Sequence, residues 1–409
     1  MSEIIKPEVL APAGDFERLK YAIQYGADAV YLGGTKFGMR AASANFDFDT
    51  LKNSVDYAHS KGKKIYLTCN TVPTNDEVEE LEEYLKGAAQ TGVDAFIIAD
   101  IGVMMTAKRV APDVDIHIST QTGIMNYVTA NELYNMGAKR VVLAREVPIE
   151  DIKRIRDKTP PELEIEAFVH GAMCMSFSGR CLISNFMVGR DANRGECAQP
   201  CRWSYHLMEE KRPGQFYPVY EDEKGSYILN AKDMSMIEHI DKVVDAGVTS
   251  LKIEGRAKSF YYVSVIANAY RCCVDEYVKN PKEYKTPQWL VEETYKVSHR
   301  EYSTGFYFGK PNQCYESGGY VREYDVIATV ENSGDGYLDL LVRNKFTQGE
   351  KAQIIAPKQK PVDIIIGDII DADEGSVESA CHPMKMVKLV CDKSFPQGAI
   401  LRRERPSAE

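Results

Sequence analysis

The chain has 409 residues, more than one hydrophobic core usually organises, so one large domain and one smaller domain are expected. Hydrophobic residues make up 44% and charged residues 27%, as in ordinary globular proteins, and no apolar run reaches the roughly 18 residues of a membrane span. A formal net charge of −10 argues against indiscriminate binding of nucleic acid or acidic membranes, while leaving room for a local basic cleft. The N-terminal residues lack the basic and apolar parts of a targeting signal, so we expect a cytoplasmic protein.

Short β-branched or apolar runs alternate with amphipathic segments of helical length, which is the pattern of a parallel β/α sheet or barrel. The predicted strands are residues 9–14, 29–34, 64–68, 95–100, 116–120, 141–145, 166–170 and 251–255. The predicted helices between them include residues 15–25, 76–91, 129–136 and 149–158. Eight such units indicate an α/β fold, a (β/α)8 barrel of the TIM type, whose active site lies at the carboxyl ends of the strands.

Three regions follow from this pattern. The barrel is expected over residues 1–280, with a cysteine-rich insertion at 171–230 after the seventh strand, part of which, 203–229, is predicted to form a β-hairpin. Helices are predicted near 233–246 and over 260–278. A connecting region spans 281–325, and short alternating strands indicate a small β-barrel domain over 326–409. Because a loop of the insertion's length is uncommon in a compact domain, we expect it to be functional.

Four cysteines fall within that insertion: Cys174, then Cys181, Cys197 and Cys201, separated by six, fifteen and three residues. Such clustering favours a metal or redox role over disulfides in a reducing compartment. Four thiolates match the ligand set of a [4Fe-4S] cluster. Structural zinc is the minor alternative, because zinc sites usually have two close cysteine pairs and only Cys197 and Cys201 resemble one. Inert thiols are the remaining possibility.

Arginines surround these cysteines, at positions 180, 190, 194 and 202. A guanidinium group suits the planar geometry of phosphate and carboxylate, so Arg180, Arg190, Arg194 and Arg202 are candidates for binding an anionic substrate. Their alternative role is to neutralise a thiolate-rich centre.

Polar residues also stand at the predicted strand ends, where the active site of a barrel is built: Asp100, Gln121, Asn126, Arg145, His170, Lys252, Glu254 and Arg256. His170 is either a general acid or base near neutral pH or a hydrogen-bonded histidine that shapes the loop. Lys252, Glu254 and Arg256 would converge on the same mouth as the cysteines, unless they form an ordinary salt-bridge network. Asp100, Gln121 and Asn126 either bind a ligand or serve the architecture of the barrel.

Several segments together resemble a known family. They are the runs at 166–181 around His170-Gly171-Ala172-Met173-Cys174, at 195–203, at 10–15, at 26–31 and at 252–256. Over nearly its whole length the chain resembles the collagenase-like peptidase family, the thirty-second peptidase family of unknown catalytic type. Within that family it looks most like the bacterial branch that hydroxylates tRNA.

The resemblance implies a function and a cofactor. It implies formation of 5-hydroxyuridine at the wobble position of tRNA without molecular oxygen, with prephenate as the donor, whereas sister branches hydroxylate ribosomal RNA or quinone precursors. It implies a [4Fe-4S] cluster on Cys174, Cys181, Cys197 and Cys201. One departure bears on the fourth ligand: some relatives place a cysteine after a Lys-Asp-Leu element, where this chain has Lys232-Asp233-Met234-Ser235.

We therefore assign catalytic roles to His170, Arg180, Glu254 and Arg256. We assign substrate binding to Arg190, Arg194, Arg202, Lys252, Asp100, Gln121 and Asn126. The expected partners are the anticodon region of tRNA, a small dicarboxylate donor and a possible second protein subunit, with no membrane. The C-terminal module, which ends in arginines 402, 403 and 405, would grip RNA or serve as a lid or oligomer contact.

A peptidase is the alternative that the family name suggests. The chain has no His-Glu-x-x-His zinc helix and no Gly-x-Ser-x-Gly nucleophile elbow. The family name therefore suggests a peptidase, but the chain contains neither of these catalytic motifs.

Overall fold

The computed structural model describes residues 5–39, 45–173, 181, 183–190, 192, 195–200, 220–222, 225–227, 232–309 and 320–405. Its larger part is a closed parallel barrel, in which the last strand pairs with both the first and the seventh. The strands are β1 (Glu8–Pro12), β2 (Ala29–Gly33), β3 (Lys64–Cys69), β4 (Ala95–Ile98), β5 (Asp115–Ile118), β6 (Arg140–Val142), β7 (Glu164–Ala172) and β11 (Ser250–Ile253). Each of the eight predicted strands overlaps one of these, so the (β/α)8 barrel is confirmed.

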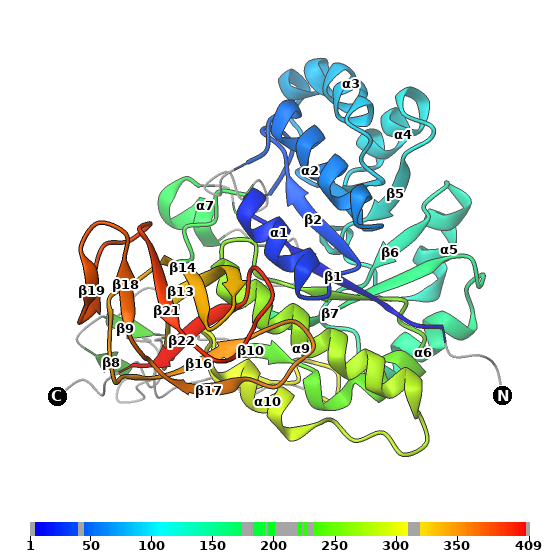
Figure 1. Ribbon diagram of the computed structural model, residues 1–409. Coiled ribbons are helices and arrows are strands. Elements are labelled where there is room, and N and C mark those ends of the chain that lie inside the picture. The colour runs from blue at the N-terminus through cyan, green and yellow to red at the C-terminus, as the bar shows by residue number, and fades with distance from the viewer. Residues whose placement is uncertain are drawn as a thin grey trace.

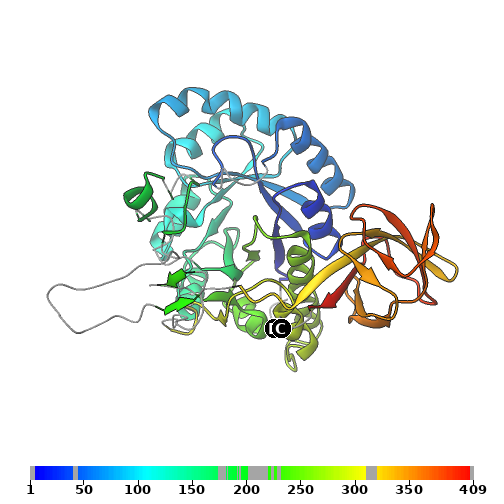
Figure 2. The same ribbon diagram turned by 90° about the vertical axis from the view of Figure 1, so that its left-hand side faces the viewer.

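Helices cover the outside of the barrel (Figures 1 and 2). They are α1 (Phe16–Gln24), α2 (Phe48–Ser60), α3 (Asn75–Gln90), α4 (Ile101–Val110), α5 (Tyr127–Asn135), α6 (Ile149–Asp157), α8 (Ile240–Asp245) and α9 (Phe260–Lys279). The sequence sets their starts, because Asp15, Asp47, Asp100 and Asn126 each cap a helix by accepting a backbone N–H. Within the described residues, no helix is long and apolar enough to cross a membrane.

The segment after the insertion differs from its prediction. Residues 233–246 were expected to be one helix, but β10 (Asp233–Ser235) comes first, then a 3-10 turn (Ile237–His239), and only then α8. β10 pairs antiparallel with the end of β7 and parallel with β12 (Tyr302–Ser303). These non-local hydrogen bonds override the local helical pattern. The short hairpin of β8 (Tyr220–Asp222) and β9 (Gly225–Tyr227) falls within the predicted hairpin region.

The C-terminal part is an eight-stranded antiparallel sheet in the order β17-β16-β22-β13-β14-β21-β18-β19, curved into a half-barrel. Its strands are β13 (Tyr324–Gly334), β14 (Tyr337–Val342), β16 (Lys351–Ile355), β17 (Val362–Ile365), β18 (Ile369–Asp371), β19 (Gly375–Val377), β21 (Met386–Val390) and β22 (Ile400–Glu404). A further pair, β15 (Phe346–Thr347) and β20 (Ser379–Ala380), lies beside it. Alternate residues such as Val387 and Leu389 form a separate apolar core.

The half-barrel packs beside α1 and α9, on the opposite side of the barrel from helix α7 (Ile183–Val188) in Figure 2. Arg402 lies completely buried at this contact. It pairs with Glu293 of α10 (Gln288–Tyr295) at 2.6 Å and also donates to the Tyr261 hydroxyl at 3.0 Å. Arg403 pairs with Glu350 and Arg405 with Asp325. Arg402 therefore holds the two parts together, and Arg403 and Arg405 pair within the half-barrel. The RNA grip and the lid or oligomer contact stay predictions.

Replacing Glu293 with alanine should destabilise the protein by about 3 kcal/mol or more, because it leaves the buried Arg402 cation without its carboxylate. Urea unfolding of the full chain measures this loss. The matched control is Asp325→Ala, which removes the partner of the more exposed Arg405 and should cost under about 1 kcal/mol. Equal effects of the two substitutions would contradict the role given to the buried pair.

Candidate active site

A buried ion network fills the interior below the barrel mouth. Arg140 contacts Glu8 at 2.7 Å and Glu166 at 3.0 Å, and the Lys252 ammonium lies 2.6 Å from the other Glu166 oxygen. Burial opposes ionisation of Glu166, but Lys252 and Arg140 outweigh it and lower the pKa of the Glu166 carboxyl. Glu166 therefore stays ionised. It holds Lys252 in place beneath the mouth.

Lys252, Tyr31, Phe168 and Glu254 form the next layer toward the mouth. The Lys252 ammonium lies 4.5 Å from the centre of the Tyr31 ring and 5.5 Å from that of Phe168. The Tyr31 hydroxyl lies 3.3 Å from a Glu254 carboxylate oxygen. Lys252 and Glu254 thus both contact Tyr31, and Lys252 pairs with Glu166 as the salt-bridge alternative expected. Their role in substrate binding stays a prediction.

Arg145 adds a second cation to this layer. Its guanidinium stacks 3.9 Å from the centre of the Phe168 ring, donates to the Ala172 carbonyl at 3.1 Å and lies 3.9 Å from Glu254. The sequence places Arg145 near a strand end, but no motif assigned it a role.

Arg256 follows the last barrel strand and is buried, with Nη1 donating to the Thr68 hydroxyl at 3.2 Å. A Cβ atom on Gly33, at the end of β2, would lie 2.4 Å from that same nitrogen. Only glycine leaves room for the guanidinium at this point. Arg256 thus lies against the ends of β2 and β3, while Arg145 contacts Phe168 and Glu254 on the side of β7 and β11.

His170 lies away from that mouth. The register of β7 against β11 shifts after Phe168, so His170 aligns with Ile253 and its ring packs near Tyr262 and Tyr270 of α9. Its two ring nitrogens lie 3.3 Å from the hydroxyls of Tyr270 and Tyr302.

Burial lowers the pKa of His170 to about 3, with smaller contributions from Lys258 and His299, so the ring is neutral at physiological pH. This geometry favours the architectural alternative stated for His170. Its catalytic role stays a prediction.

Asp100 and Asn126 serve as helix caps. The Asp100 carboxylate accepts the Val103 N–H, and the Asn126 amide oxygen accepts the Thr129 N–H, each at 3.0 Å. Both therefore have an architectural task, and their predicted ligand contacts stay predictions. Gln121 differs, because its amide oxygen is buried and accepts no hydrogen bond from the described residues.

The cysteine insertion is described in part. Cys174 and Cys201 lie outside the described residues, as do Arg180, Arg194 and Arg202, whereas Arg190 is exposed after α7. Cys181 is half-buried just before α7, and Cys197 is exposed.

The described part of the insertion suits a thiolate-bound group. The Ser184 hydroxyl of α7 accepts the Ala198 N–H at 3.0 Å, which draws the segment around Cys197 back to the helix that follows Cys181. The Gln199 N–H donates to the Cys197 sulfur at 3.4 Å, a contact that would favour the thiolate form. Among the described residues, no three His, Cys, Asp or Glu side chains lie close enough together to hold a metal ion. The four-cysteine set, which both an iron–sulfur cluster and zinc would accept, therefore stays a prediction.

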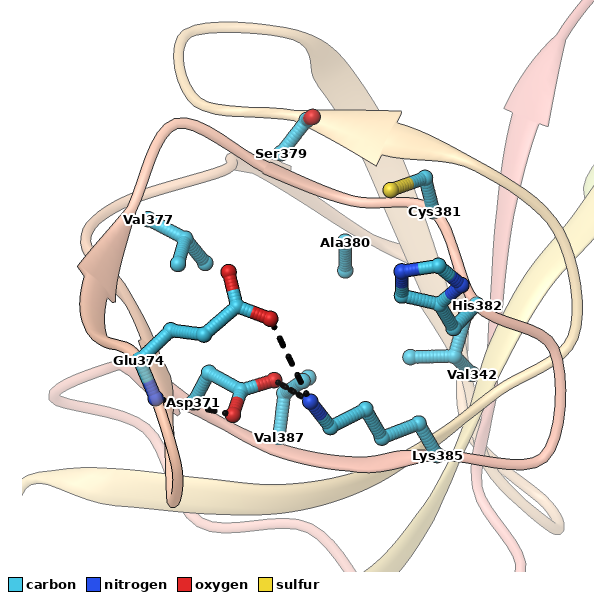
Figure 3. A pocket seen from close by; sticks show the side chains of 10 residues that line it. All are labelled: Val342, Asp371, Glu374, Val377, Ser379, Ala380, Cys381, His382, Lys385 and Val387. Carbon is cyan, nitrogen blue, oxygen red and sulfur yellow. Dashed lines mark hydrogen bonds and ion pairs between the residues drawn. The ribbon is translucent and has the colours of Figure 1, made fainter.

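A small pocket lies in the C-terminal half-barrel, away from these residues (Figure 3). Its cavity of about 40 Å³ has room for a few water molecules. Lys385 reaches into it and pairs with Asp371 at 2.7 Å, with Cys381 and His382 on the other side. Because its own ion pair occupies the polar wall, this pocket is not the candidate active site.

The chain matches known proteins over most of its length. Residues 14–317 match the family model of peptidase family U32, and residues 322–402 match its C-terminal domain. The chain is 36% identical to tRNA hydroxylation protein P1 of Bacillus subtilis (strain 168), over 97% of this chain and 95% of that protein. It is 35% identical to tRNA hydroxylation protein P of Escherichia coli (strain K12), over 87% of each. It is 37% identical to the 23S rRNA 5-hydroxycytidine synthase of the same strain, over 72% of this chain and 44% of that protein.

Proposed function

The chain belongs to peptidase family U32, and we propose that it is a tRNA-modifying enzyme that hydroxylates a wobble uridine to 5-hydroxyuridine. The observation that carries the proposal is its similarity to proteins named for tRNA hydroxylation, over almost the full length of both chains. The barrel mouth supplies a place for the chemistry, since cations and one carboxylate converge there. A tRNA substrate agrees with the cytoplasmic location expected from the sequence.

We assign Cys174, Cys181, Cys197 and Cys201 as the ligands of a [4Fe-4S] cluster, which when bound accepts and passes single electrons. The contact between α7 and the segment around Cys197 supports this assignment. Zinc at the same thiolates is the minor alternative.

We place the donor, a dicarboxylate such as prephenate, between Arg256 and Arg145. Both guanidinium groups are held in fixed orientations, one by Thr68 and the other by the Phe168 ring. Preorganised cations of this kind bind carboxylates with little loss of side-chain freedom. Arg180, Arg194 and Arg202 would then be available for RNA phosphates, and a second protein subunit would complete the site if electrons are delivered from outside.

The peptidase alternative lacks a matching geometry. Among the described residues, no hydrogen bond joins a histidine to a serine or cysteine side chain, and His170 faces tyrosine hydroxyls instead. Nucleophilic proteolysis depends on such a pair. Relatives that modify RNA are therefore the better guide to the activity.

Deleting the gene should leave bulk tRNA without 5-hydroxyuridine and the nucleosides derived from it, because the proposal makes this enzyme the source of the hydroxyl group on the uridine ring. Mass spectrometry of digested tRNA measures the change. Re-expression of the intact chain should restore the nucleosides, and re-expression of a Cys181→Ala chain should not. Unchanged nucleosides in the deletion strain would overturn the proposal, whereas a peptidase gene predicts that result.

A further inference from the structure

Ser119 continues an inward-facing row of the barrel, and Gln121 lies in the turn that follows it. The His117 ring of β5 meets the Tyr66 ring of β3 at 4.6 Å, and Tyr66 belongs to the cluster of side chains inside the barrel. Side chains alternate along a strand, so Ser119, directly after β5, lies one step nearer the mouth on the same face as His117. Gln121 follows in the 3-10 turn Thr120–Thr122, which Ser119 caps by accepting the Gln121 N–H. The equivalent row on β3 runs from Tyr66 through Thr68 to Asn70.

The two rows meet above β4. The Asn70 amide nitrogen donates to the Ser119 hydroxyl at 3.3 Å, a contact between alternate strands of the kind that builds the layers of such barrels. Thr68, one step below Asn70, binds Arg256. Ser119 is thus linked through Asn70 to the strand end that holds Arg256, and Gln121 follows Ser119 by two residues.

The Ser119 hydroxyl can form one more hydrogen bond, as a donor. Its oxygen accepts two hydrogen bonds, from the Asn70 side chain at 3.3 Å and from the Gln121 backbone N–H at 3.4 Å. A hydroxyl group has two lone pairs and one proton, so both lone pairs are used and the proton is the group that Ser119 can still offer. Because Ser119 is only 3% exposed, bulk water is a poor partner for that proton.

Gln121 presents the complementary group. Its amide oxygen is buried and accepts no hydrogen bond from the described residues. Native proteins rarely leave a buried acceptor in this condition, because its desolvation is not repaid. Asn70 provides the contrast, since its oxygen accepts the Met39 N–H at 3.2 Å while its nitrogen binds Ser119. Asn70 is occupied in holding the site, whereas Gln121 has an unused acceptor.

We infer that Ser119 and Gln121 form the base-reading edge of this site and recognise the imide of uracil. The Gln121 oxygen accepts the N3–H of the base, and the Ser119 hydroxyl donates to the carbonyl at C4. Enzymes that act on an extruded base read its Watson–Crick edge in this way. Binding at N3 leaves the C5–C6 edge of the ring free for reaction. The inference rests on the proposed function and names the residues that select its substrate.

The pair discriminates against cytosine. Cytosine presents an unprotonated N3 and an amino group, so its N3 lone pair would face the Gln121 oxygen. Rotating the Gln121 amide would relieve that conflict. Ser119 would still be unable to accept from the cytosine amino group, because both of its lone pairs are taken.

The test pairs a protein change with a change in the base. Gln121→Met keeps the length of the side chain and removes the acceptor, and an anticodon stem-loop carrying N3-methyluridine at the target removes the N–H donor. On uridine RNA, the substitution should lower kcat/KM about ten- to hundredfold, the effect of leaving one buried N–H unpaired. On N3-methyluridine RNA the wild-type chain should already be slow, and Gln121→Met should change the rate little. Gln348→Met, at a half-buried glutamine of the half-barrel, is the matched control and should match wild type on both RNAs.

The outcomes separate the two proposals. An equal loss on both RNAs would show that Gln121 only supports the fold, and no loss on uridine RNA, or fast reaction of wild type on N3-methyluridine RNA, would also overturn the inference. Failure of the wild-type chain on every RNA, together with unchanged tRNA in the deletion strain, would instead remove the proposed function. Thermal unfolding checks that Gln121→Met is folded; if it is not, Gln121→Asn, which withdraws the amide by one methylene, takes its place with the same expected pattern.

Discussion

Chains in which Cys174 or Cys181 is replaced by alanine should be purified anaerobically without iron, whereas the wild-type chain should carry roughly four iron atoms, as one four-cysteine cluster requires. The thiolates hold the cubane as one unit, so loss of a ligand should release the whole cluster rather than a quarter of its iron. Iron and sulfide analysis together with visible absorbance measure the loss.

Cys391→Ala is the control for this experiment. Cys391 packs against the apolar core of the half-barrel, far along the chain from the insertion, and should leave the iron content unchanged. Loss of iron in all three variants would mean that the division into ligands and bystanders is wrong. Stoichiometric zinc without iron in the wild-type chain would replace the cluster by the zinc alternative.

The barrel could be predicted because each of its strands carries a local signal. Runs such as residues 95–98 are apolar, short and bounded by helical segments, and a parallel strand needs nothing more distant to be recognised. The segment at 233–246 failed for the opposite reason. Its first residues form a strand only because the end of β7 and β12 offer backbone partners, and those partners are distant in sequence.

The candidate site could be predicted in part for similar reasons. The run Lys252-Ile253-Glu254-Gly255-Arg256 identified one strand end, and the barrel architecture required its polar residues to meet others at the mouth. The sequence could not show that a register shift in β7 turns His170 toward α9.

Three further features were beyond the sequence for the same reason. Arg145 stacks on Phe168, Ser119 has both lone pairs occupied, and Arg402 is buried against Glu293. Each depends on which side chains from distant segments arrive at the same point. Alternation along β5 from His117 was the one local signal that could have singled out Ser119.

Arg256→Lys should lower hydroxylation about a hundredfold or more, while iron content and the absorbance of the cluster stay at wild-type values. Arg256 is buried, its Nη1 atom is fixed by Thr68, and Gly33 leaves space for the flat guanidinium group. A lysine in this space keeps the positive charge but has one point of contact, so it cannot bind a carboxylate through two parallel hydrogen bonds while also reaching Thr68. The loss should therefore appear as weaker use of the dicarboxylate donor, with tRNA binding unchanged.

Arg145→Lys should lower hydroxylation in the same way if the two guanidinium groups hold one donor between them. The double substitution should then lower activity by less than the two single losses combined, because residues that bind one ligand are coupled. Arg109→Lys provides the matched control, since that arginine forms an exposed pair with Glu82 on the outer helices. Hydroxylation kinetics at varied donor concentration, with tRNA saturating, measure these effects. Full activity in both Arg256→Lys and Arg145→Lys would show that the donor is bound elsewhere, and the arginines of the insertion would then be the next groups to replace.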